Sequence, residues 1–381
     1  MPSPDCPSAL PSGRTLVGLR TKLLNWFDAH RRNLPWRVSR DAYRIWVSEV
    51  MLQQTTVAAV VPFFERFLAA LPTVEALAKA DEQQVLKLWE GLGYYRRARH
   101  LHAAAKELVA NSAGKLPDDP TVWADLPGVG RYILGAVLSQ AFDRKLPIVE
   151  ANSLRVLARL FGYRGDPREG EGKAWVWSAA EALLPQKRVG DFNQALMELG
   201  ALVCLPTGPA CGQCPLAANC KANQDGLQEK IPPPKKQPAT VAVSEVGVVV
   251  RDGSRVLLCR RPEDAGRWQN MWEVPHAPRA TDEEVSIAVV RVAKELTGLD
   301  VEAGAEVLTI RHAVTRYRIA LVCVEAALRG GQFTPGFYAA SEWLTPSELD
   351  KHPVSSPQRK LMRELASQVT RGKGRGARSE K

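Results

Sequence analysis

Four cysteines stand close together in the chain with the spacing C-x6-C-x2-C-x5-C: Cys204, Cys211, Cys214 and Cys220. Thiolates at this density repel one another unless a cation or an inorganic cluster lies between them, so the array predicts one metal-containing site. A zinc ribbon draws its ligands from two separated C-x-x-C pairs, whereas this array has one tight pair with a single cysteine on each side. The spacing favours an iron–sulfur cluster, with zinc or disulfides as the alternatives.

A second candidate site is the short motif Leu126-Pro-Gly-Val-Gly130, which precedes an apolar run suited to a helix. Two glycines allow backbone N–H groups to converge on an anion, and the N-terminus of the following helix adds its dipole. A helix–hairpin–helix grips a DNA phosphate in this way without reading sequence, here at Gly128 and Gly130. Taken alone, the motif is a weak signal and is more typical of a purely structural turn.

The elements that carry these motifs belong to a basic chain of 381 residues, long enough for two or three domains. Its formal charge of +10 favours a polyanionic partner, nucleic acid first, over a merely basic soluble protein. No apolar run approaches the ~20 residues of a membrane span, and residues 1–13 lack the apolar segment of a secretory signal. Because a thiolate site needs a reducing compartment, we expect a cytoplasmic, non-membrane protein.

Composition divides the chain into two bodies, a linker and two tails. The first body has helical periodicity interrupted by Pro and Gly, and the connector after it is rich in proline. We predict a disordered tail over 1–14, a helical body over 15–223 with the cysteine loop at 204–220, a linker over 224–240, a second body over 241–365, and a basic disordered tail over 366–381.

From residue 241 the pattern becomes that of an α+β domain. This domain begins with an apolar run to Arg251, followed by the hairpin signal Asp252-Gly253 and a second strand to Arg261. Thr281-Asp-Glu-Glu284 has the form of a capping box, which predicts a helix that ends near Thr297. Two further strands are expected over 305–311 and 317–324.

Five motifs occur in one order: Leu34-Pro-Trp-Arg37, Ser48-Glu-Val-Met-Leu-Gln-Gln-Thr55, Gly91-Leu-Gly-Tyr-Tyr95, the 126–130 turn and the cysteine loop. Together they closely resemble the MutY-type adenine DNA glycosylases of the endonuclease III superfamily, densely over residues 20–222 and more faintly to about 345. The resemblance implies an all-α helix–hairpin–helix domain with a [4Fe–4S] cluster. It also implies a monomer that acts on double-stranded DNA containing adenine opposite 8-oxoguanine or guanine.

The resemblance assigns acid catalysis to Glu49. Adenine leaves poorly until a ring nitrogen is protonated, and a carboxyl group near apolar neighbours keeps its proton more easily than in water. Glu49 and Gln53 are four residues apart and are expected to share one helix face. Without the motif, an ordinary solvated glutamate would be the expectation. The stripe of this helix that we expect to be buried consists of Tyr43, Trp46, Val47 and Val50.

Chemistry on a base requires that the nucleotide leave the stack, with side chains to fill the gap and to hold the ring. By the resemblance, Gln53 and Tyr94 enter the duplex near the lesion. The positions that match the adenine pocket are Trp36, Arg37, Leu52, Gln54 and Gln194. Trp36 and Leu52 are equally compatible with core packing, and Gln194 occupies a position where relatives carry Glu or Gln.

Tyr132 indicates the type of glycosylase. Endonuclease III-like lyases carry a lysine at the matching position, which forms a Schiff base with the sugar and then cleaves the strand. Tyrosine cannot form that imine, so we expect a monofunctional enzyme that leaves an abasic site. A buried structural tyrosine is the alternative.

One motif departs from the family pattern. The family's D-G-N-x-x-R-V-L reads Glu150-Ala-Asn-Ser-Leu-Arg-Val-Leu157 here. Glu150 keeps the charge that stabilises an oxocarbenium-like sugar, but its extra methylene displaces the carboxylate by about 1.5 Å, enough to cost roughly a hundredfold in rate. Since Asn152 is retained in the motif, we expect Glu150 to serve in catalysis. A noncatalytic lesion-binding protein is the alternative, as is another base-excision specificity.

The second body resembles a Nudix domain, through Trp272-Glu-Val-Pro275 and a partial Nudix box. Val292 and Leu296 replace two of the box's glutamates, and hard cations need several carboxylate oxygens, so a lesion-binding scaffold is expected rather than a nucleotide hydrolase. In relatives a loop between two strands reads 8-oxoguanine with an F-S-H sequence. Here that loop reads Val314-Thr315-Arg316, so only the hydroxyl of Thr315 remains.

Overall fold

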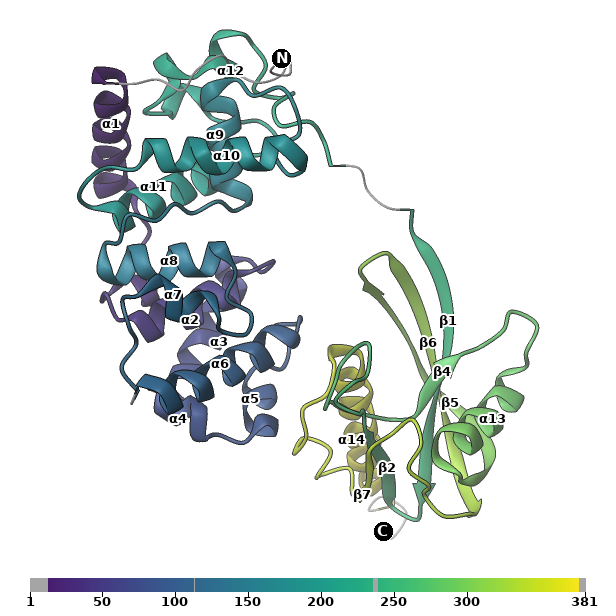
Figure 1. Cartoon of the computed structure of the whole chain (residues 1–381). Helices are drawn as coiled ribbons and strands as arrows, with labels where there is room; N and C mark the ends of the chain where they lie inside the picture. Colours follow the sequence, from purple (N-terminus) through teal and green to yellow (C-terminus); the bar gives the residue numbers. More distant parts are fainter. Residues whose placement is uncertain (1–12, 113, 236–238, 377–381) are drawn as a thin grey trace. The chain divides into compact units, whose positions relative to one another are not determined.

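The computed structural model describes residues 13–112, 114–235 and 239–376, and the contacts within these ranges group into two bodies (Figure 1). The N-terminal body consists of residues 13–79 and 100–235. The C-terminal body consists of residues 239–376 together with an internal segment, residues 80–99. The sequence analysis had placed residues 80–99 in the helical body predicted over 15–223.

The N-terminal body is all-α, as predicted. Its α-helices are α1 (Arg14–His30), α2 (Ala42–Leu52), α3 (Val57–Ala70), α4 (Val74–Lys79), α6 (Arg96–Ser112, whose first turn belongs to the C-terminal body), α7 (Pro120–Ala124), α8 (Arg131–Phe142), α9 (Ala151–Phe161), α10 (Gly170–Leu183), α11 (Val189–Leu202) and α12 (Lys221–Gln224). Three 3-10 turns complete it: η1 (Pro35–Arg37), η2 (Cys211–Gln213) and η3 (Ala217–Asn219).

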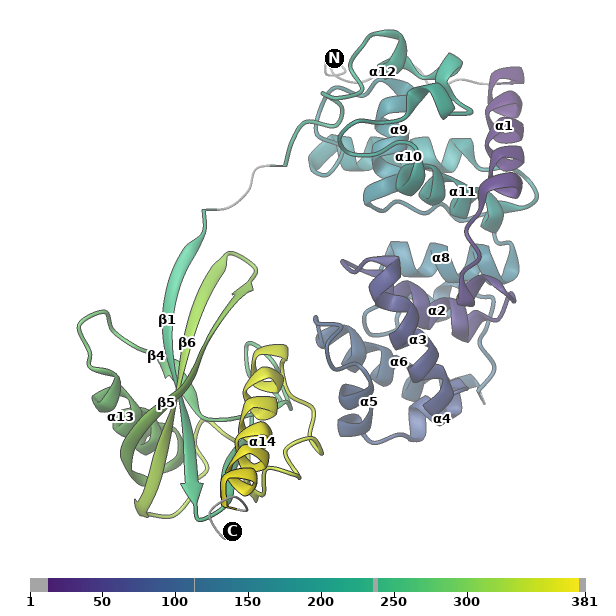
Figure 2. The same ribbon diagram turned by 180° about the vertical axis from the view of Figure 1, so that it is seen from behind.

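One apolar core joins the chain's first helix to its later ones. Phe27 of α1, Leu157 of α9, Val176 of α10 and Phe192 of α11 are buried together, and Figure 2 shows α1 alongside α11. Three of the four clustered cysteines pack against the same core. The cysteine loop and the N-terminus of α9 are therefore positioned by one packed unit.

The C-terminal body is a mixed sheet with helices, which confirms the α+β prediction. Its strands are β1 (Val241–Asp252), β2 (Arg255–Arg260), β3 (Trp272–Glu273), β4 (His276–Pro278), β5 (Asp300–Val314), β6 (Tyr317–Gly330) and β7 (Ala340–Leu344). Its helices are α5 (Glu82–Leu88), α13 (Val285–Thr297) and α14 (Ser356–Gly376).

The sheet has the order β3-β2-β1-β6-β5, with β4 paired to β1 and β7 paired to β2. β1 and β6 run parallel, and the other pairs are antiparallel. One apolar core lies between the sheet and α14, and a second lies between the sheet and α13. The two helices thus cover opposite faces, as Figure 1 shows.

Most predicted elements of this body are present, but its helices differ from expectation. The predicted capping box does not form, because α13 begins only at Val285 and Glu284 is its N-cap, without a side-chain hydrogen bond. The carboxylate of the neighbouring Glu283 binds Arg291. α14 was not predicted, and its backbone stays helical to Gly376, within the stretch expected to be disordered. Residues 1–12 and 377–381 of the predicted tails lie outside the described residues.

The predicted linker is anchored over its first half. Arg159 Nε donates to the carbonyl of Ile231 (2.7 Å), and Arg168 Nη2 donates to the carbonyl of Pro233 (2.7 Å). Ile231 is buried against α9 and α12. The N-terminal body therefore extends at least to residue 233, and residues 236–238 lie outside the described part of the chain.

Candidate active site

Glu49 lies in a helix that is buried on every side. Asp41 caps α2 by accepting from the N–H of Arg44, and all residues of α2 from Ile45 to Met51 are buried. Glu49 itself is 2% exposed. The predicted buried stripe is confirmed, but α2 has no solvent-facing side over this stretch. Glu49 is therefore not an ordinary surface glutamate.

Both oxygens of Glu49 are held by side chains of α8, which packs against α2. The Tyr132 hydroxyl donates to Oε2, and Gln140 Nε2 donates to Oε1 at 2.8 Å. Because Tyr132 and Gln140 project from one helix, the carboxyl group is fixed in direction as well as in position. Tyr132 is thus in contact with the predicted acid, whereas Gln140 was not among the predicted residues.

Burial raises the pKa of Glu49, although the hydrogen bonds from Tyr132 and Gln140 and the charge of Arg37 act against this. Burial, together with the neighbouring Glu49, also raises the pKa of Tyr132 well above its ordinary value, so the phenol stays a hydrogen-bond donor. A carboxyl group that keeps its proton to higher pH than usual is what a general acid requires.

Glu150 caps the helix that follows it. Its carboxylate accepts from the backbone N–H groups of Asn152 (2.8 Å) and Ser153 (2.7 Å), and the hydroxyl of Ser153 accepts from the N–H of Glu150 (2.8 Å). The extra methylene is thus accommodated by a side chain that turns back onto the N-terminus of α9. Burial raises the pKa of this half-buried carboxyl, and the two backbone hydrogen bonds work against that increase.

Asn152 links Glu150 to the cysteine loop through an arginine. Asn152 Nδ2 donates to Glu150 Oε2 (3.2 Å), and its carbonyl oxygen accepts from Arg155 Nη2 (2.8 Å). Arg155 Nε then donates to the carbonyl of Cys204 (2.7 Å). A continuous chain of hydrogen bonds therefore joins the carboxylate to the first cysteine.

Arg37 and Gln194, both predicted to line the adenine pocket, are hydrogen-bonded to each other (Arg37 Nε to Gln194 Oε1, 2.8 Å). Arg37 also pairs with Glu198 (Nη2 to Oε2, 3.0 Å), which forms a second ion pair with Arg32 (2.8 Å). Burial alone would raise the pKa of Glu198, but the hydrogen bonds from Arg32 and Arg37 lower it to about 2. This carboxylate is therefore permanently charged and structural.

The motif at 126–130 forms the predicted turn between α7 and α8. Gly128 has a φ of 76°, and a Cβ at this position would lie 2.6 Å from the Cβ of His100, so both the backbone and the space require glycine. Gly130 is the N-cap of α8. The backbone N–H groups at the start of α8 are thus available to an anion, on the same helix that carries Tyr132.

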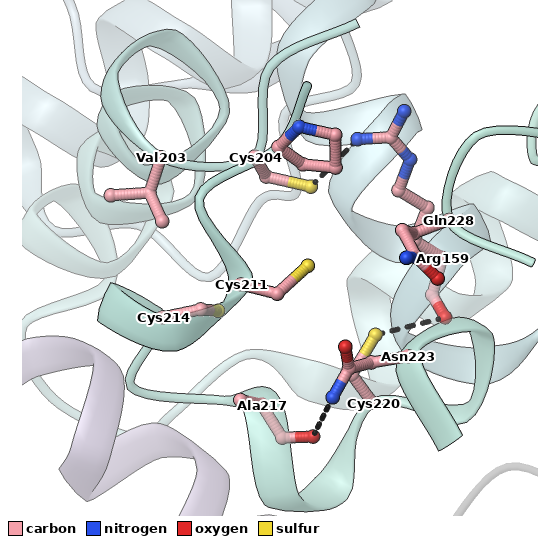
Figure 3. A pocket seen from close by; sticks show the side chains of 10 residues that line it. Arg159, Val203, Cys204, Cys211, Cys214, Ala217, Cys220, Asn223 and Gln228 are labelled. Atoms are coloured by element: carbon pink, nitrogen blue, oxygen red, sulfur yellow. Dashed lines mark hydrogen bonds between the residues drawn. The ribbon is translucent and has the colours of Figure 1, made fainter. Parts of the chain in front are cut away.

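All four cysteines of the loop line one pocket, and all four carry free thiols (Figure 3). Arg159 Nη1 donates to Cys204 Sγ at 3.4 Å. Burial raises the pKa of the Cys214 thiol to about 11, and burial and the neighbouring thiols also raise those of Cys211 and Cys220. Without a cation these thiols stay protonated, so the donor set suits a positively charged metal group.

Comparison with family models finds one match in each half of the sequence. Residues 47–180 match the model described as "HhH-GPD superfamily base excision DNA repair protein", and residues 245–364 match the NUDIX domain model. The first match covers α2, α8 and the start of α9, and therefore Glu49, Tyr132 and Glu150.

Curated relatives match over both bodies. The human adenine DNA glycosylase is 31% identical over 91% of this chain and 74% of its own length. The chain belongs to the adenine DNA glycosylase family. The adenine DNA glycosylase of Buchnera aphidicola subsp. Schizaphis graminum is 34% identical over 67% of this chain and 73% of its own length. Membership makes the chain a DNA N-glycosylase of base excision repair.

A solved relative supports the fold of the N-terminal body. A thermostable thymine-DNA glycosylase is 29% identical to this chain with a TM-score of 0.50, and the match covers 56% of this chain and 98% of the other. The adenine DNA glycosylase family thus shares its helical body with an enzyme whose name states a different base.

Several positions matched to the family's base-contacting residues lie near the end of α2. Leu52 and Gln53 are half-buried, and Gln54 is exposed with a φ of 57°. Trp36 is 4% exposed and packs edge-on against Phe64, with 5.3 Å between ring centroids. Trp36 therefore serves at least the packing of the core.

Two predicted DNA-contacting residues of this family member belong to the C-terminal body. Tyr94 is 54% exposed and has a φ of 49°. Thr315 forms the turn between β5 and β6 with Arg316, and its hydroxyl donates to the carbonyl of Val314 (2.7 Å). Both side chains stand at the tips of turns, where they are accessible.

Three residues in the hydrogen-bond networks around Glu49 and Arg37 were not predicted from the sequence of this adenine DNA glycosylase family member: Gln140, Glu198 and Arg32. Each acts through a partner at least 91 positions away in the chain. Gln140 is a buried polar residue in an apolar helix, and that was the available signal. For Glu198 the corresponding signal was a glutamate within the otherwise apolar α11.

Proposed function

We propose that this protein hydrolyses the N-glycosidic bond of adenine mispaired with 8-oxoguanine or guanine in double-stranded DNA and leaves an abasic site. The observation that carries the proposal is the buried carboxyl group of Glu49, held by Tyr132 and Gln140. A carboxyl group in this environment is a proton donor at pH values where a surface glutamate is ionised.

The reaction divides between two carboxyl groups. Glu49 protonates a ring nitrogen of the adenine and so improves the leaving group. Glu150, as the carboxylate, stabilises the positive charge that develops on the sugar, and a water molecule then completes hydrolysis. The charge of Glu49 raises the pKa of Glu150, so the two groups are near enough to interact. Since Tyr132 has no amine, no imine forms with the sugar and no strand cleavage follows.

We infer that the four cysteines hold a [4Fe–4S] cluster. They line one pocket. Their spacing, one tight pair with a single cysteine on each side, differs from the two separated C-x-x-C pairs of a zinc ribbon and favours an iron–sulfur cluster. The cluster would tie the loop to α9 and so support Glu150 through Arg155 and Asn152.

The C-terminal body is proposed to bind the lesion opposite the adenine rather than to hydrolyse nucleotides. Glu283 and Glu295, which survive from the Nudix box, both pair with Arg291 (2.7 and 3.1 Å). Val292 stands where a metal-binding glutamate is needed and is buried in the core. Both of the remaining carboxylates are therefore paired with one guanidinium. The hydroxyl of Thr315 is the proposed contact to 8-oxoguanine.

The remaining proposals concern the partner and the compartment. A net charge of +10 and the open N-terminus of α8 at Gly130 favour duplex DNA, bound by a monomer. A cytoplasmic location follows from the cysteines' need for reduction. In the part of the chain that is described, no helix is long and apolar enough to cross a membrane.

Base release from defined duplexes tests the proposal. Single-turnover reactions compare adenine opposite 8-oxoguanine, adenine opposite guanine, thymine opposite guanine, and undamaged pairs, each with and without alkali. We expect adenine release and strand breaks that depend on alkali. Release of thymine instead would establish another specificity on the same fold, and tight binding without release would make the protein a lesion sensor.

A further inference from the structure

The turn between α5 and α6 presents one exposed tyrosine on a constrained backbone. Gly91, Gly93 and Tyr94 have φ angles of 100°, 75° and 49°. The positive φ is costly for tyrosine and persists only where surrounding contacts hold the turn. Tyr94 is 54% exposed, whereas Tyr95 beside it is 6% exposed. The turn therefore has a buried base and a projecting tip.

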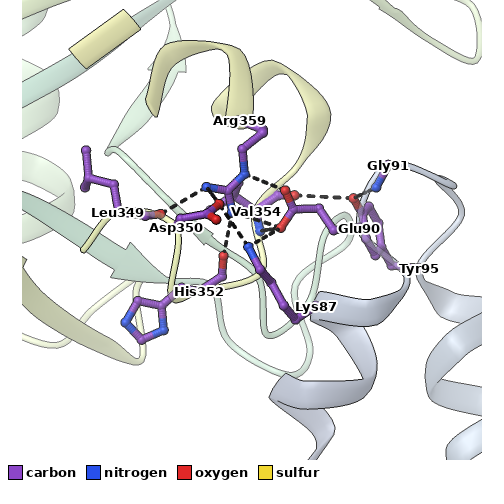
Figure 4. Close-up of polar contacts among 9 residues, drawn as sticks. All are labelled: Lys87, Glu90, Gly91, Tyr95, Leu349, Asp350, His352, Val354 and Arg359. Atoms are coloured by element: carbon purple, nitrogen blue, oxygen red, sulfur yellow. Dashed lines mark hydrogen bonds and ion pairs between the residues drawn. The ribbon is translucent and has the colours of Figure 1, made fainter. Parts of the chain in front are cut away.

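The first side of the turn is held by an arginine of α14. Arg359 binds both oxygens of Glu90, with Nη2 at 2.9 Å from Oε2, and both side chains are nearly buried, at 10% and 13% exposure (Figure 4). Arg359 is itself fixed, because it donates to the carbonyls of His352 (2.9 Å) and Leu349 (3.1 Å). A two-pronged pair between fixed partners sets direction as well as distance.

The second side of the turn is held by the same segment, residues 349–359. The Tyr95 hydroxyl donates to the carbonyl of Val354 (3.3 Å) and accepts from the N–H of Gly91 (3.3 Å). The N–H of Val354 donates to Glu90 Oε2 (3.4 Å). Residues on both sides of Tyr94 thus bind one short stretch of the C-terminal body.

The preceding helix is attached at a separate point. Trp272 Nε1 donates to Gln83 Oε1 (3.0 Å), and Gln83 Nε2 donates to the carbonyl of Asn270 (2.9 Å). Asn270 Nδ2 also donates to Glu82 Oε1 (2.7 Å). α5 is therefore bonded to the residues at the start of β3, and the segment 80–99 has a second point of attachment within the C-terminal body.

We propose that Glu90 and Arg359 are positioning residues for Tyr94, so that the lesion-binding body itself carries and aims the tyrosine that enters the duplex. This inference rests on the proposed function, which assigns Tyr94 to the DNA. Its consequence is that recognition of the lesion and opening of the base stack are performed by one body, although Tyr94 lies within the helical half of the sequence.

Coupling between substitutions tests this proposal. The variants are Glu90→Gln, which keeps the shape but removes the charge; Arg359→Lys and Arg359→Met; Tyr94→Ala; and the double variant Glu90→Gln/Tyr94→Ala. Glu325→Gln is the matched control, because Glu325 pairs with Arg251 between β1 and β6 in the same body. The readouts are the fluorescence of a 2-aminopurine next to 8-oxoguanine on binding, the single-turnover rate of adenine release, and Tm.

We expect Glu90→Gln to reduce both the 2-aminopurine signal and the release rate, the latter by about tenfold, as for a lost charged hydrogen bond. Arg359→Met should act alike, Arg359→Lys should recover part of the signal, and Glu325→Gln should change neither readout. In the Tyr94→Ala background, Glu90→Gln should add less than about twofold, because the two residues act through one contact.

Independent, multiplicative losses in the double variant would overturn the proposal, as would equal losses in Glu325→Gln or an unchanged signal in Glu90→Gln. The fluorescence readout distinguishes failure of the proposed function from failure of the proposed role of Glu90. A wild-type protein that opens the stack but releases no adenine contradicts the proposed function. The effect of Glu90→Gln on that opening still decides whether Glu90 positions Tyr94.

Discussion

The two bodies surround their glutamates in opposite ways. Glu49 in the N-terminal body is enclosed by α2 and α8, and burial raises its pKa. Glu283 in the C-terminal body is bound through both oxygens by Arg291, whose hydrogen bonds lower the pKa of that carboxyl. The same type of side chain thus has an environment suited to proton donation in one body and forms half of an ion pair in the other.

The contrast shows that the ionisation of a glutamate depends both on its burial and on the charge of the groups that bind its carboxyl oxygens. Glu198 is as buried as Glu49, at 1% exposure, yet its two arginines keep it ionised. Glu49 is bound by a phenol and an amide, which are neutral donors. Neutral donors orient a carboxyl group without fixing its charge, and that combination suits acid catalysis.

The largest expected effect comes from Glu49→Gln, which keeps the shape and removes the proton. We expect adenine release to fall by about a thousandfold, within the range for loss of a general acid, while lesion DNA is still bound. Single-turnover release and a binding titration measure the two properties. Glu65→Gln on the exposed face of α3 is the control. A release rate for Glu49→Gln within tenfold of the wild-type rate would contradict the contrast between the two glutamates.

Glu150→Gln is expected to slow release by about a hundredfold, because the amide no longer stabilises charge on the sugar. The amide oxygen can still cap α9, so folding should be retained. Glu150→Asp, which has the length found in the family motif, should equal or exceed wild type. An abasic-site assay measures all three proteins. Equal activity of Glu150→Gln and wild type would exclude Glu150 from catalysis.

Glu198 is expected to affect the free energy of unfolding rather than the rate of adenine release. Its pKa is lowered to about 2 in the folded protein, so its contribution is present above the pKa of the unfolded chain, near 4.5. That contribution is lost as the pH falls from about 5 to 2. Glu198→Gln should lower the free energy of unfolding by about 3 kcal/mol at pH 7, because the partly buried guanidiniums of Arg32 and Arg37 lose their charged partner.

Urea unfolding at pH 7 and at pH 4 measures this effect. The difference between wild type and Glu198→Gln should shrink at the lower pH, as Glu198 begins to protonate in the unfolded chain. A difference that is the same at both pH values would contradict the assigned charge state.

The smallest expected effect is that of Glu283→Gln. This substitution removes an ion pair outside the proposed chemistry, so adenine release should stay within about twofold of wild type. The wild-type protein should also leave nucleoside triphosphates intact in the presence of magnesium. Product analysis by chromatography tests the second statement, and triphosphate hydrolysis that Glu283→Gln abolishes would restore the Nudix box to function.

Local patterns carried much of the fold. The buried stripe at Trp46, the glycine turn at Gly128, the cysteine spacing and the strands on either side of Gly253 all depend on residues within a few positions of one another. Periodicity and turn chemistry act at this range, which is why they could be predicted without a structure.

The features that sequence did not predict depend on distant partners. Gln140 meets Glu49 across 91 positions, and Arg359 meets Glu90 across 269. Contacts between such distant positions leave no periodic pattern in the sequence. For the same reason, the sequence could not show that residues 80–99 belong to the C-terminal body.

The measurement that tests the central claim most directly is the pH dependence of single-turnover adenine release. Glu49 and Glu150 titrate as an interacting pair. We expect Glu150 to ionise first, because two backbone N–H groups stabilise its carboxylate and it is less buried.

The rate should therefore rise as Glu150 loses its proton and fall at higher pH as Glu49 loses its own, above the usual glutamate pKa of 4.5 because burial raises the pKa of Glu49. Tyr132→Phe should move the falling limb to higher pH, because the Tyr132 hydrogen bond lowers the pKa of Glu49. A falling limb near pH 4.5, or one that persists unchanged in Glu49→Gln, would contradict the assignment of Glu49 as the acid.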